Sequence, residues 1–193
     1  DTIGSIDDLI EQYNEIINKI NSYCEVYVLK SIKHLSKNVD LKEICNITSG
    51  KSKLKCKEGD IPIIGANGLI GFTNEFNNYG DILVTGRVGT LGSFHRYNNK
   101  VWCSDNTLIM KSDYINFIHY YLLQNFNISN LNKGSTQPLI TQTDLGKMEI
   151  KIPHNINDIE LVLGKMSKFI FSYNEKIKEL SLIKNKYLQK FFG

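Results

Sequence analysis

Apolar residues spaced alternately three and four apart at both ends of this 193-residue chain are the feature that most limits its fold. The N-terminal series contains Ile6, Ile10, Tyr13, Ile17 and Ile20. The C-terminal series contains Leu163, Met166, Ile170, Tyr173, Ile177 and Leu180. Such heptad seams predict two long helices that pack against each other or against copies in a partner chain. The alternative for the first seam is an amphipathic helix that covers a core of its own.

The two predicted helices also resemble each other in sequence. Tyr13-Asn14-Glu15 recurs as Tyr173-Asn174-Glu175, and at the same offset most apolar seam positions coincide. A shared heptad explains the apolar matches, but it does not require the polar Asn-Glu pair to match. We therefore interpret the helices as parts of a repeat whose unit is one globular region followed by one helix.

The region between the helices has the pattern of a mostly-β domain. Short apolar runs separated by Gly and Asn predict strands at residues 61–64, 81–85, 100–103, 107–110 and 148–152. One helix is predicted from Tyr114 to Phe126. We expect an α+β chain in three parts: an N-terminal spacer helix at 1–35, a globular domain at 36–155 and a long C-terminal spacer or dimerisation helix at 156–193.

Composition narrows the class of protein. With 41% hydrophobic residues and a net charge of +3, the chain can build a packed core. The sequence has neither an apolar run of membrane-spanning length nor a signal-peptide start, so we expect no membrane association. The four cysteines form no CxxC pair and the four histidines lack ligand spacing. We therefore predict no metal site and a reducing, cytoplasmic location.

Motifs of nucleotide binding and catalysis are incomplete. The glycines at 86, 89 and 92 follow a predicted strand, but a strand-like run rather than a helix comes next. Gly50-Lys51-Ser52 lacks the first glycine of a Walker loop, because Cys45 stands there. Glu149-Ile150-Lys151 matches the end of a nuclease signature, yet no Pro-Asp pair precedes it. We expect no catalytic residue and no resident cofactor.

The positive signal is basic and polar. Four lysines alternate from Lys51 to Lys57, on one face if that stretch is extended. Arg87 stands among glycines, where a backbone can approach a ligand and a guanidinium can read guanine. A solvated loop and a structural arginine are the alternatives. The candidate DNA-binding residues are Lys51, Ser52, Lys53, Lys55, Lys57, Asn67, Arg87, Thr90, Lys133, Ser135, Thr136 and Gln137.

Four phrases in this order resemble the target-recognition domain of the specificity (S) subunit of type I restriction–modification systems. They are residues 61–75 (IPIIGANGLIGFTNE), 86–92 (GRVGTLG), 102–108 (WCSDNTL) and 134–141 (GSTQPLIT). The family also alternates recognition domains with helical spacers, which accounts for the repeat. A departure lies near Pro153, where many members carry a Pro-Leu-Pro-like stretch.

The resemblance implies a non-catalytic reader of double-stranded DNA. It would direct the methyltransferase (M) subunits, and through them the restriction (R) subunits, to a target. S-adenosylmethionine, ATP and Mg²⁺ would belong to those partners. The family usually has two recognition domains, so one domain implies half of an S subunit or a half-size version that dimerises through its helices. The alternatives are a coiled-coil interaction protein that does not bind DNA and, less favoured, a stand-alone DNA enzyme.

Overall fold

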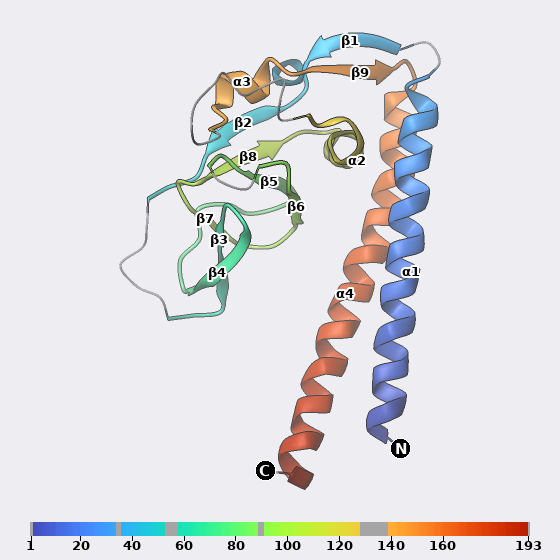
Figure 1. Cartoon of the computed structure of the whole chain (residues 1–193), viewed down its shortest axis with the longest axis vertical. Coiled ribbons are helices and arrows are strands. Elements are labelled where there is room, and N and C mark those ends of the chain that lie inside the picture. Colours follow the sequence, from blue (N-terminus) through green and yellow to red (C-terminus); the bar gives the residue numbers. More distant parts are fainter. Residues whose placement is uncertain (1, 34–35, 53–57, 89–90, 128–138, 193) are drawn as a thin grey trace.

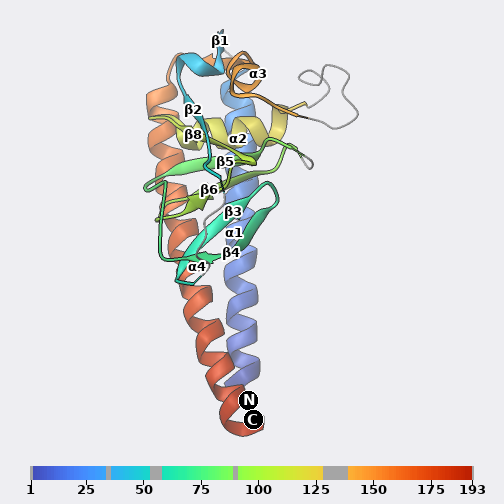
Figure 2. The ribbon, with the colours of Figure 1, turned by 90° about the vertical axis from the view of Figure 1, so that its left-hand side faces the viewer.

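The computed structural model describes residues 2–33, 36–52, 58–88, 91–127 and 139–192. A globular domain lies beside one end of two long helices, which run alongside each other and extend well beyond it (Figures 1 and 2). The helices are α1 (Thr2–Ser31) and α4 (Ile156–Phe192). The predicted α+β architecture, a sheet-rich domain between two long helices, is confirmed.

The two long helices are antiparallel neighbours. Asp7 near the start of α1 pairs with Lys184 near the end of α4, with 2.5 Å between Oδ1 and Nζ. The rings of Tyr13 and Tyr173 lie 5.2 Å apart. The residues of the two sequence seams are buried or half-buried in this arrangement. Consequently, both ends of the chain lie together, away from the domain (Figure 1).

The tyrosine contact reveals a local symmetry in the helix pair. Tyr13 and Tyr173 occupy equivalent positions of the sequence repeat. In an antiparallel pair, a residue meets its own repeat counterpart only where a local two-fold axis crosses the pair. The Lys176 ammonium completes the contact, 5.5 Å from both ring centroids. The helix pair is therefore close to two-fold symmetric at the level of its sequence.

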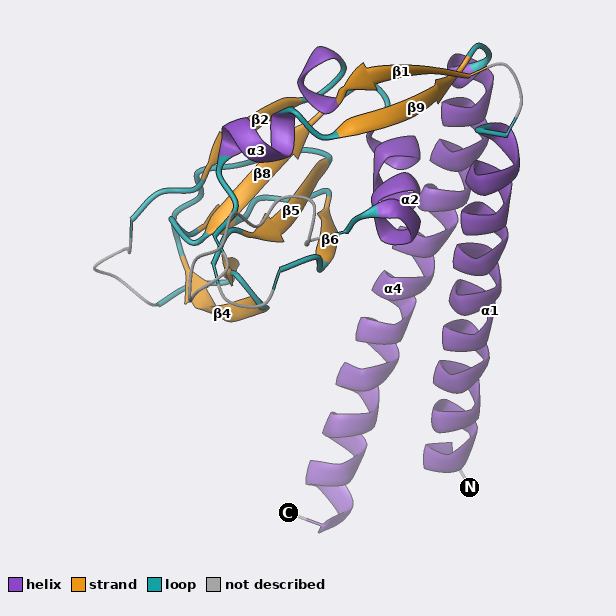
Figure 3. Cartoon of the chain, turned by 45° about the horizontal axis from the view of Figure 1, so that its top comes forward, coloured by secondary structure: helices purple, strands orange, loops and turns teal. Residues whose placement is uncertain are grey.

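Three small sheets build the domain. The four-stranded sheet is antiparallel, in the order β2 (Asn46–Ser49), β8 (Thr107–Lys111), β5 (Ile82–Gly86) and β6 (Phe94–Tyr97). The three-stranded sheet has the order β4 (Gly68–Thr73), β3 (Ile61–Gly65) and β7 (Trp102–Cys103), with β3 parallel to β7. A ribbon of β1 (Ser36–Asp40) and β9 (Glu149–Pro153) lies across the upper end of the helix pair (Figure 3).

Sequence analysis found the buried strands but missed several others. All five predicted strands correspond to strands of the structure, whereas β1, β2 and β4 were not predicted. Each of these three lies at an edge and pairs with one neighbour. Strands β1 (SKNVD) and β2 (NITS) consist mostly of polar residues, so their apolar alternation is weak. In β4, Gly68 and Gly71 interrupt an apolar run whose large side chains are exposed. The short helices η1 (Leu41–Glu43) and α3 (Gln142–Gly146) also lacked a sequence signal of sufficient length.

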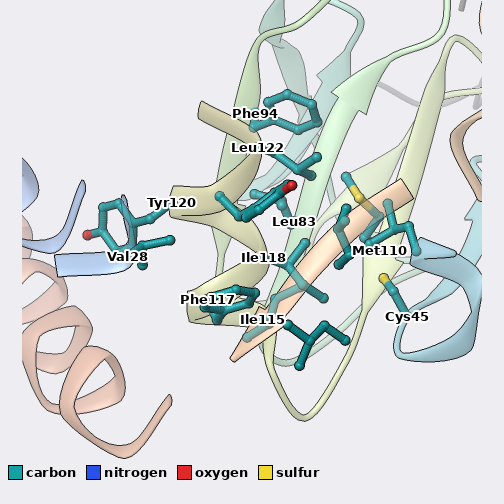
Figure 4. Packing of buried hydrophobic residues seen from close by; sticks show 14 of the residues in the cluster. Val28, Cys45, Leu83, Phe94, Met110, Ile115, Phe117, Ile118, Tyr120 and Leu122 are labelled. Atoms are coloured by element: carbon teal, nitrogen blue, oxygen red, sulfur yellow. The ribbon is translucent and has the colours of Figure 1, made fainter. Parts of the chain in front are cut away.

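One hydrophobic core joins the domain to both long helices. Helix α2 (Ile115–Asn125) lies between the four-stranded sheet and the two long helices. Figure 4 shows Tyr120 directed toward Val28 of α1, while Leu122 faces Leu83 of β5. Ile159 and Leu163 of α4 belong to the same cluster. The near halves of α1 and α4 are therefore part of the domain core.

A second, smaller cluster lies on the other face of the four-stranded sheet. Strand β5 alternates between the two clusters, because Leu83 belongs to the first whereas Ile82 and Val84 belong to the second. The other buried members of the second cluster are Ile64, Val101, Cys103 and Ile109. The two inner strands, β5 and β8, are thus buried on both faces and form the rigid centre of the domain.

A polar network fixes α2 to α4. The Glu160 carboxylate of α4 accepts hydrogen bonds from the backbone N–H groups of Asn116 (3.1 Å) and Phe117 (2.8 Å), in the first turn of α2. A carboxylate at this position satisfies free N–H groups and stabilises the positive end of the helix dipole. Arg96 donates to Asn116 Oδ1 (2.8 Å) and binds the Asp81 carboxylate through Nε (3.0 Å) and Nη2.

Helix α2 is also fixed to α1. The Tyr120 hydroxyl donates to Asn21 Oδ1 (2.9 Å), and Gln124 Nε2 donates to Glu25 Oε2 (2.7 Å). Since α2 has hydrogen-bond partners on both long helices as well as apolar contacts with both, it sets the orientation of the domain relative to the helix pair.

Candidate nucleic-acid interface

A tight turn connects β7 to β8 at the end of the sheet remote from the helices. The Thr107 N–H and hydroxyl both donate to the Ser104 carbonyl, at 3.0 and 2.7 Å. These bonds close a β-turn with Asp105 and Asn106 at its tip. The side chains at the tip belong to exposed residues, whereas Ser104 and Thr107 are buried.

Three neighbouring segments contact this turn through their backbones. After β2, the Gly50 N–H donates to the Thr107 carbonyl (3.1 Å). After β5, the Arg87 N–H donates to the Asn106 carbonyl (3.0 Å). The Ser104 N–H donates to the carbonyl of Ile64 in β3 (2.9 Å), just before the 65–68 turn. We name segments 50–52, 65–68, 87–88 and 104–107 the loop cluster.

Sheet topology explains why these segments meet. Strands β2 and β5 are both antiparallel to β8, so their C-terminal ends flank the start of β8. Strand β8 then leads to α2, which places the loop cluster on the side of the domain away from the helices (Figure 1). Gly50 permits the closest approach, because a Cβ there would lie 2.0 Å from the Ser104 carbonyl oxygen.

The structure brings together the predicted DNA-binding residues that it describes. Lys51, Ser52 and Asn67 are exposed and Arg87 is half-buried, and all four belong to the loop cluster. The other candidates, Lys53, Lys55, Lys57, Thr90, Lys133, Ser135, Thr136 and Gln137, lie outside the described residues.

The segment that follows the undescribed stretch 128–138 also reaches the cluster. Leu139 forms an antiparallel bridge with Val88, and the Ile140 N–H donates to the Arg87 carbonyl (2.9 Å). The backbone of Arg87 is therefore held on both sides.

The cationic side chains of the loop cluster form no ion pair within the described part of the chain. Neither Lys51 nor Arg87 forms an ion pair or a side-chain hydrogen bond with a described residue. In contrast, the other arginine, Arg96, is bound to Asp81 and Asn116. Two cationic side chains in one loop cluster, neither with an ionic partner among the described residues, favour an anionic ligand such as a phosphate backbone.

A cleft of about 570 Å³ lies within the loop cluster. Its polar side chains are those of Ser52, Asn67, Ser104, Asp105 and Asn106, and Ile70 forms an apolar wall. The Ser104 hydroxyl is buried and has no hydrogen-bond partner among the described residues. Sequence analysis did not select Ser104, Asp105 or Asn106 as site residues, because a polar turn between two strands is commonplace and only the fold places this one between Lys51 and Arg87.

A larger cleft, of about 830 Å³, lies nearer the β1–β9 ribbon and carries no comparable chemistry. Its charged residues are of both signs, with Lys42 and Lys147 beside Glu43 and Asp113. Burial raises the pKa of the Cys45 thiol in its wall to about 12, so this thiol stays protonated and unreactive near neutral pH. In the described part of the chain, no cluster of His, Cys, Asp and Glu could hold a metal ion.

Exposed apolar residues along both long helices present a second surface. Ile16 and Tyr23, one heptad apart on α1, are exposed. On α4 the exposed apolar residues include Phe169, Ile183 and Tyr187. Ile16 and Tyr23 flank the N-terminal seam, and Ile183 and Tyr187 continue the C-terminal series after a shift of phase. None of the described helices is long and apolar enough to cross a membrane.

A solved structure of 18% identity shares the architecture of this chain. The chain is similar over its whole length to the S subunit of a type I restriction–modification system from M. genitalium, at 18% identity and a TM-score of 0.76. A second match is to the HsdS subunit from Thermoanaerobacter tengcongensis, covering 97% of this chain at 15% identity and a TM-score of 0.49. The chain spans 59% and 56% of those two proteins. No curated protein sequence matches it.

The family model gives the assignment. Residues 33–182, which include the domain, the loop cluster and most of α4, match the model for the type I restriction modification DNA specificity domain. The resemblance inferred from four sequence phrases is thereby confirmed, and the chain belongs to the family of type I restriction–modification DNA specificity domains.

Proposed function

We propose that this chain is the sequence-reading half of a type I specificity subunit, which binds double-stranded DNA through the loop cluster and assembles through its helix pair. The observation that carries the proposal is the location of Lys51 and Arg87. They are the unpaired cations of a cluster that also contains a polar cleft, on the side of the domain away from the helices. DNA and protein partners can then bind opposite ends of one rigid domain.

The two cations have different roles in this proposal. Lys51 has an exposed side chain, which can neutralise a phosphate without reading sequence. Arg87 is half-buried and its backbone is held between Asn106 and Ile140. A guanidinium fixed in this way suits bidentate recognition of guanine in the major groove. Lys53, Lys55, Lys57, Lys133 and Gln137 remain predicted DNA contacts.

Catalysis belongs to the partner subunits in this proposal. The chain directs methyltransferase subunits, and through them the restriction subunits, to the DNA site. The partner subunits, and not this chain, bind S-adenosylmethionine, ATP and Mg²⁺. The proposal is supported by family membership. Added S-adenosylmethionine or Mg²⁺ should therefore give neither methylation nor cleavage by the purified chain.

The local two-fold axis suggests where a second half would lie. Applied to the domain, a two-fold axis between Tyr13 and Tyr173 would put a second recognition domain at the opposite end of the helix pair. That second domain would belong to the other half of the subunit or to a second copy. The exposed apolar residues of the helix pair are proposed to contact the methyltransferase subunits.

A salt titration tests the DNA-binding part. Binding of the full chain to duplex DNA should weaken linearly in log K against log salt, and Lys51→Ala should reduce the slope by about one while weakening all sequences alike. Arg87→Ala should leave the slope nearly unchanged and reduce the preference for the target by about 1–3 kcal/mol. Equal weakening of target and scrambled duplexes by Arg87→Ala would make this residue a phosphate contact instead.

Two adjacent isoleucines test the assembly part. Ile16 is 37% exposed, whereas Ile17 is 9% exposed and faces α4. Ile16→Asp should preserve the folded helix pair and weaken co-purification with the methyltransferase subunits. Ile17→Asp should destabilise the chain itself. If Ile16→Asp leaves assembly intact, α1 does not contribute to that interface.

The runner-up function, a coiled-coil interaction protein that does not bind DNA, is favoured by the same exposed apolar residues on the projecting helices. It makes the opposite prediction for the titration. Salt-independent or undetectable DNA binding, together with intact assembly through the helices, would favour it over the specificity subunit.

A further inference from the structure

The Asp105–Asn106 tip is the part of the loop cluster whose chemistry differs from that of its neighbours. Asp105 is exposed, and its carboxylate forms no ion pair with any described residue. Its turn is flanked by the backbones of Lys51, which bridges Ser104, and Arg87, which bonds Asn106. The turn that carries this carboxylate is therefore flanked by the backbones of two cationic residues, on the surface that we propose to face DNA.

A carboxylate at this place limits what part of DNA can approach it. A phosphate would be repelled, since two like charges about 4 Å apart cost about 1 kcal/mol even in bulk water and more near a protein surface. The edges of bases are different, because cytosine and adenine present an exocyclic amine as a hydrogen-bond donor in the major groove. A carboxylate accepts hydrogen bonds from such amines.

The cleft beneath the tip has the lining that a base edge requires. Asp105 and Asn106 share it with Asn67, Ser104 and Ile70. Among the described residues that line the cleft there is no Lys or Arg, so this part of the lining does not favour a phosphate. The Ser104 hydroxyl is buried without a described partner, and Ile70 offers the apolar contact that suits a pyrimidine methyl group or ring edge.

The turn is also rigid enough to discriminate. Its tip is closed by two bonds between Thr107 and Ser104, and its backbone is bonded to segments on both sides. A contact made by such a turn gives selectivity because little conformational freedom is lost on binding.

We propose that Asp105 is a specificity-determining residue that accepts a hydrogen bond from the exocyclic amine of one cytosine or adenine in the target. Asn106 and Asn67 bind the neighbouring base edges. The proposal rests on the proposed DNA-reading function and deepens it, since it assigns the chemical group that is read.

Selection from a library of randomised duplexes tests the proposal with the full chain. The wild type should recover a consensus in which one position is restricted to cytosine or adenine on one strand. Asp105→Asn should relax or change the preference at that position alone, by about tenfold in relative affinity, because an amide can also donate to guanine or thymine. Lys51→Ala is the matched control in the same cluster and should leave the consensus unchanged while weakening all duplexes.

A second measurement tests the wild type with altered DNA and uses the variant only as a comparison. In the selected duplex, the relevant adenine is replaced by purine, or the cytosine by 2-pyrimidinone, which removes only the exocyclic amine. Wild-type affinity should fall about tenfold, and affinity of Asp105→Asn should change much less.

Each outcome supports or overturns an identified claim. If Asp105→Asn strengthens binding to all duplexes equally with an unchanged consensus, the carboxylate only repels phosphates and the proposal is wrong. An unchanged consensus with unchanged affinity would also reject it. If the wild type binds DNA but selects no consensus, or does not bind, the proposed DNA-reading function fails and the role of Asp105 fails with it.

Discussion

The two arginines of the chain lie at opposite sides of the same domain and have opposite surroundings. Arg96, toward the helices, is bound to Asp81 and Asn116, and its guanidinium lies 5.9 Å from the Phe171 ring centroid. Arg87, in the loop cluster, has a fixed backbone but no described partner for its side chain. The difference teaches that charge alone does not locate a binding site, since a cation with all its bonds satisfied within the protein has none left for a ligand.

Replacing each arginine by alanine should give the largest contrast. Arg96→Ala removes hydrogen bonds to a carboxylate and leaves the Asn116–Glu160 pair without its neighbour, so it should lower the free energy of unfolding by about 3 kcal/mol. Arg87→Ala should change it by less than about 0.5 kcal/mol. Urea unfolding of both variants is the measurement. Equal losses would abolish the distinction between the two sides.

Two glycines, one in the loop cluster and one in α4, allow the same comparison of the two sides of the domain by backbone packing. Gly50→Ala would place a Cβ 2.0 Å from the Ser104 carbonyl oxygen, so the loop cluster must shift at a cost of about 2 kcal/mol. At Gly164 in α4 a Cβ would lie 3.6 Å from Asn116 Nδ2, an ordinary contact. Gly164→Ala should therefore stabilise the chain by about 0.5–1 kcal/mol through helix propensity. Thermal melting separates the two signs, and a stabilising Gly50→Ala would contradict the close approach.

His119 on α2 gives the helix side a pH dependence. Burial, aided by the positive charge of Arg96, lowers its pKa from 6.5 to about 4. As the pH falls below about 6.5, His119 takes up a proton in the unfolded chain while it stays neutral in the folded chain. The free energy of unfolding is therefore not reduced by His119 above about pH 6.5, and it decreases as the pH falls from 6.5 toward 4. Between about pH 7 and pH 4.5 we expect a loss near 2 kcal/mol from this residue. The test compares urea unfolding of the wild type and His119→Gln over that range, and parallel curves would show that His119 does not titrate in this way.

An ion pair at the far end of the helices should have the smallest effect. Lys184 and Asp7 join α4 to α1, with side chains 30% and 49% exposed. Lys184→Gln should cost about 0.5 kcal/mol or less, and high salt should remove most of this difference. This exposed pair gives the reference loss of stability against which the more buried Arg96–Asp81 pair is compared. A loss as large as that of Arg96→Ala would show that burial is not the reason for the strength of the Arg96 network.

The sequence predicted the parts of the fold that depend on periodicity. Heptad spacing located both long helices, and apolar runs located the strands that became β3, β5 and β8. It did not indicate that Cys24 and Val28 would enter the domain core, because a seam pattern does not specify its partner. Four of the predicted DNA-binding residues lie together in the loop cluster, but Asp105 was missed since only antiparallel pairing with β8 brings its turn between segments far apart in sequence.

Strand β8 is a short stiff rod between the proposed reading tip and the helices. Its five residues span about 17 Å, and it is hydrogen-bonded to β2 on one side and β5 on the other. Asn106 immediately precedes its first residue and Tyr114 soon follows its last, where Glu160 fixes α2 to α4. With so little mechanical compliance between these points, tilting the tip by a few degrees would tilt the helix pair with it. We therefore expect the bending that a DNA-bound assembly needs to occur in the DNA or between subunits, rather than within this domain.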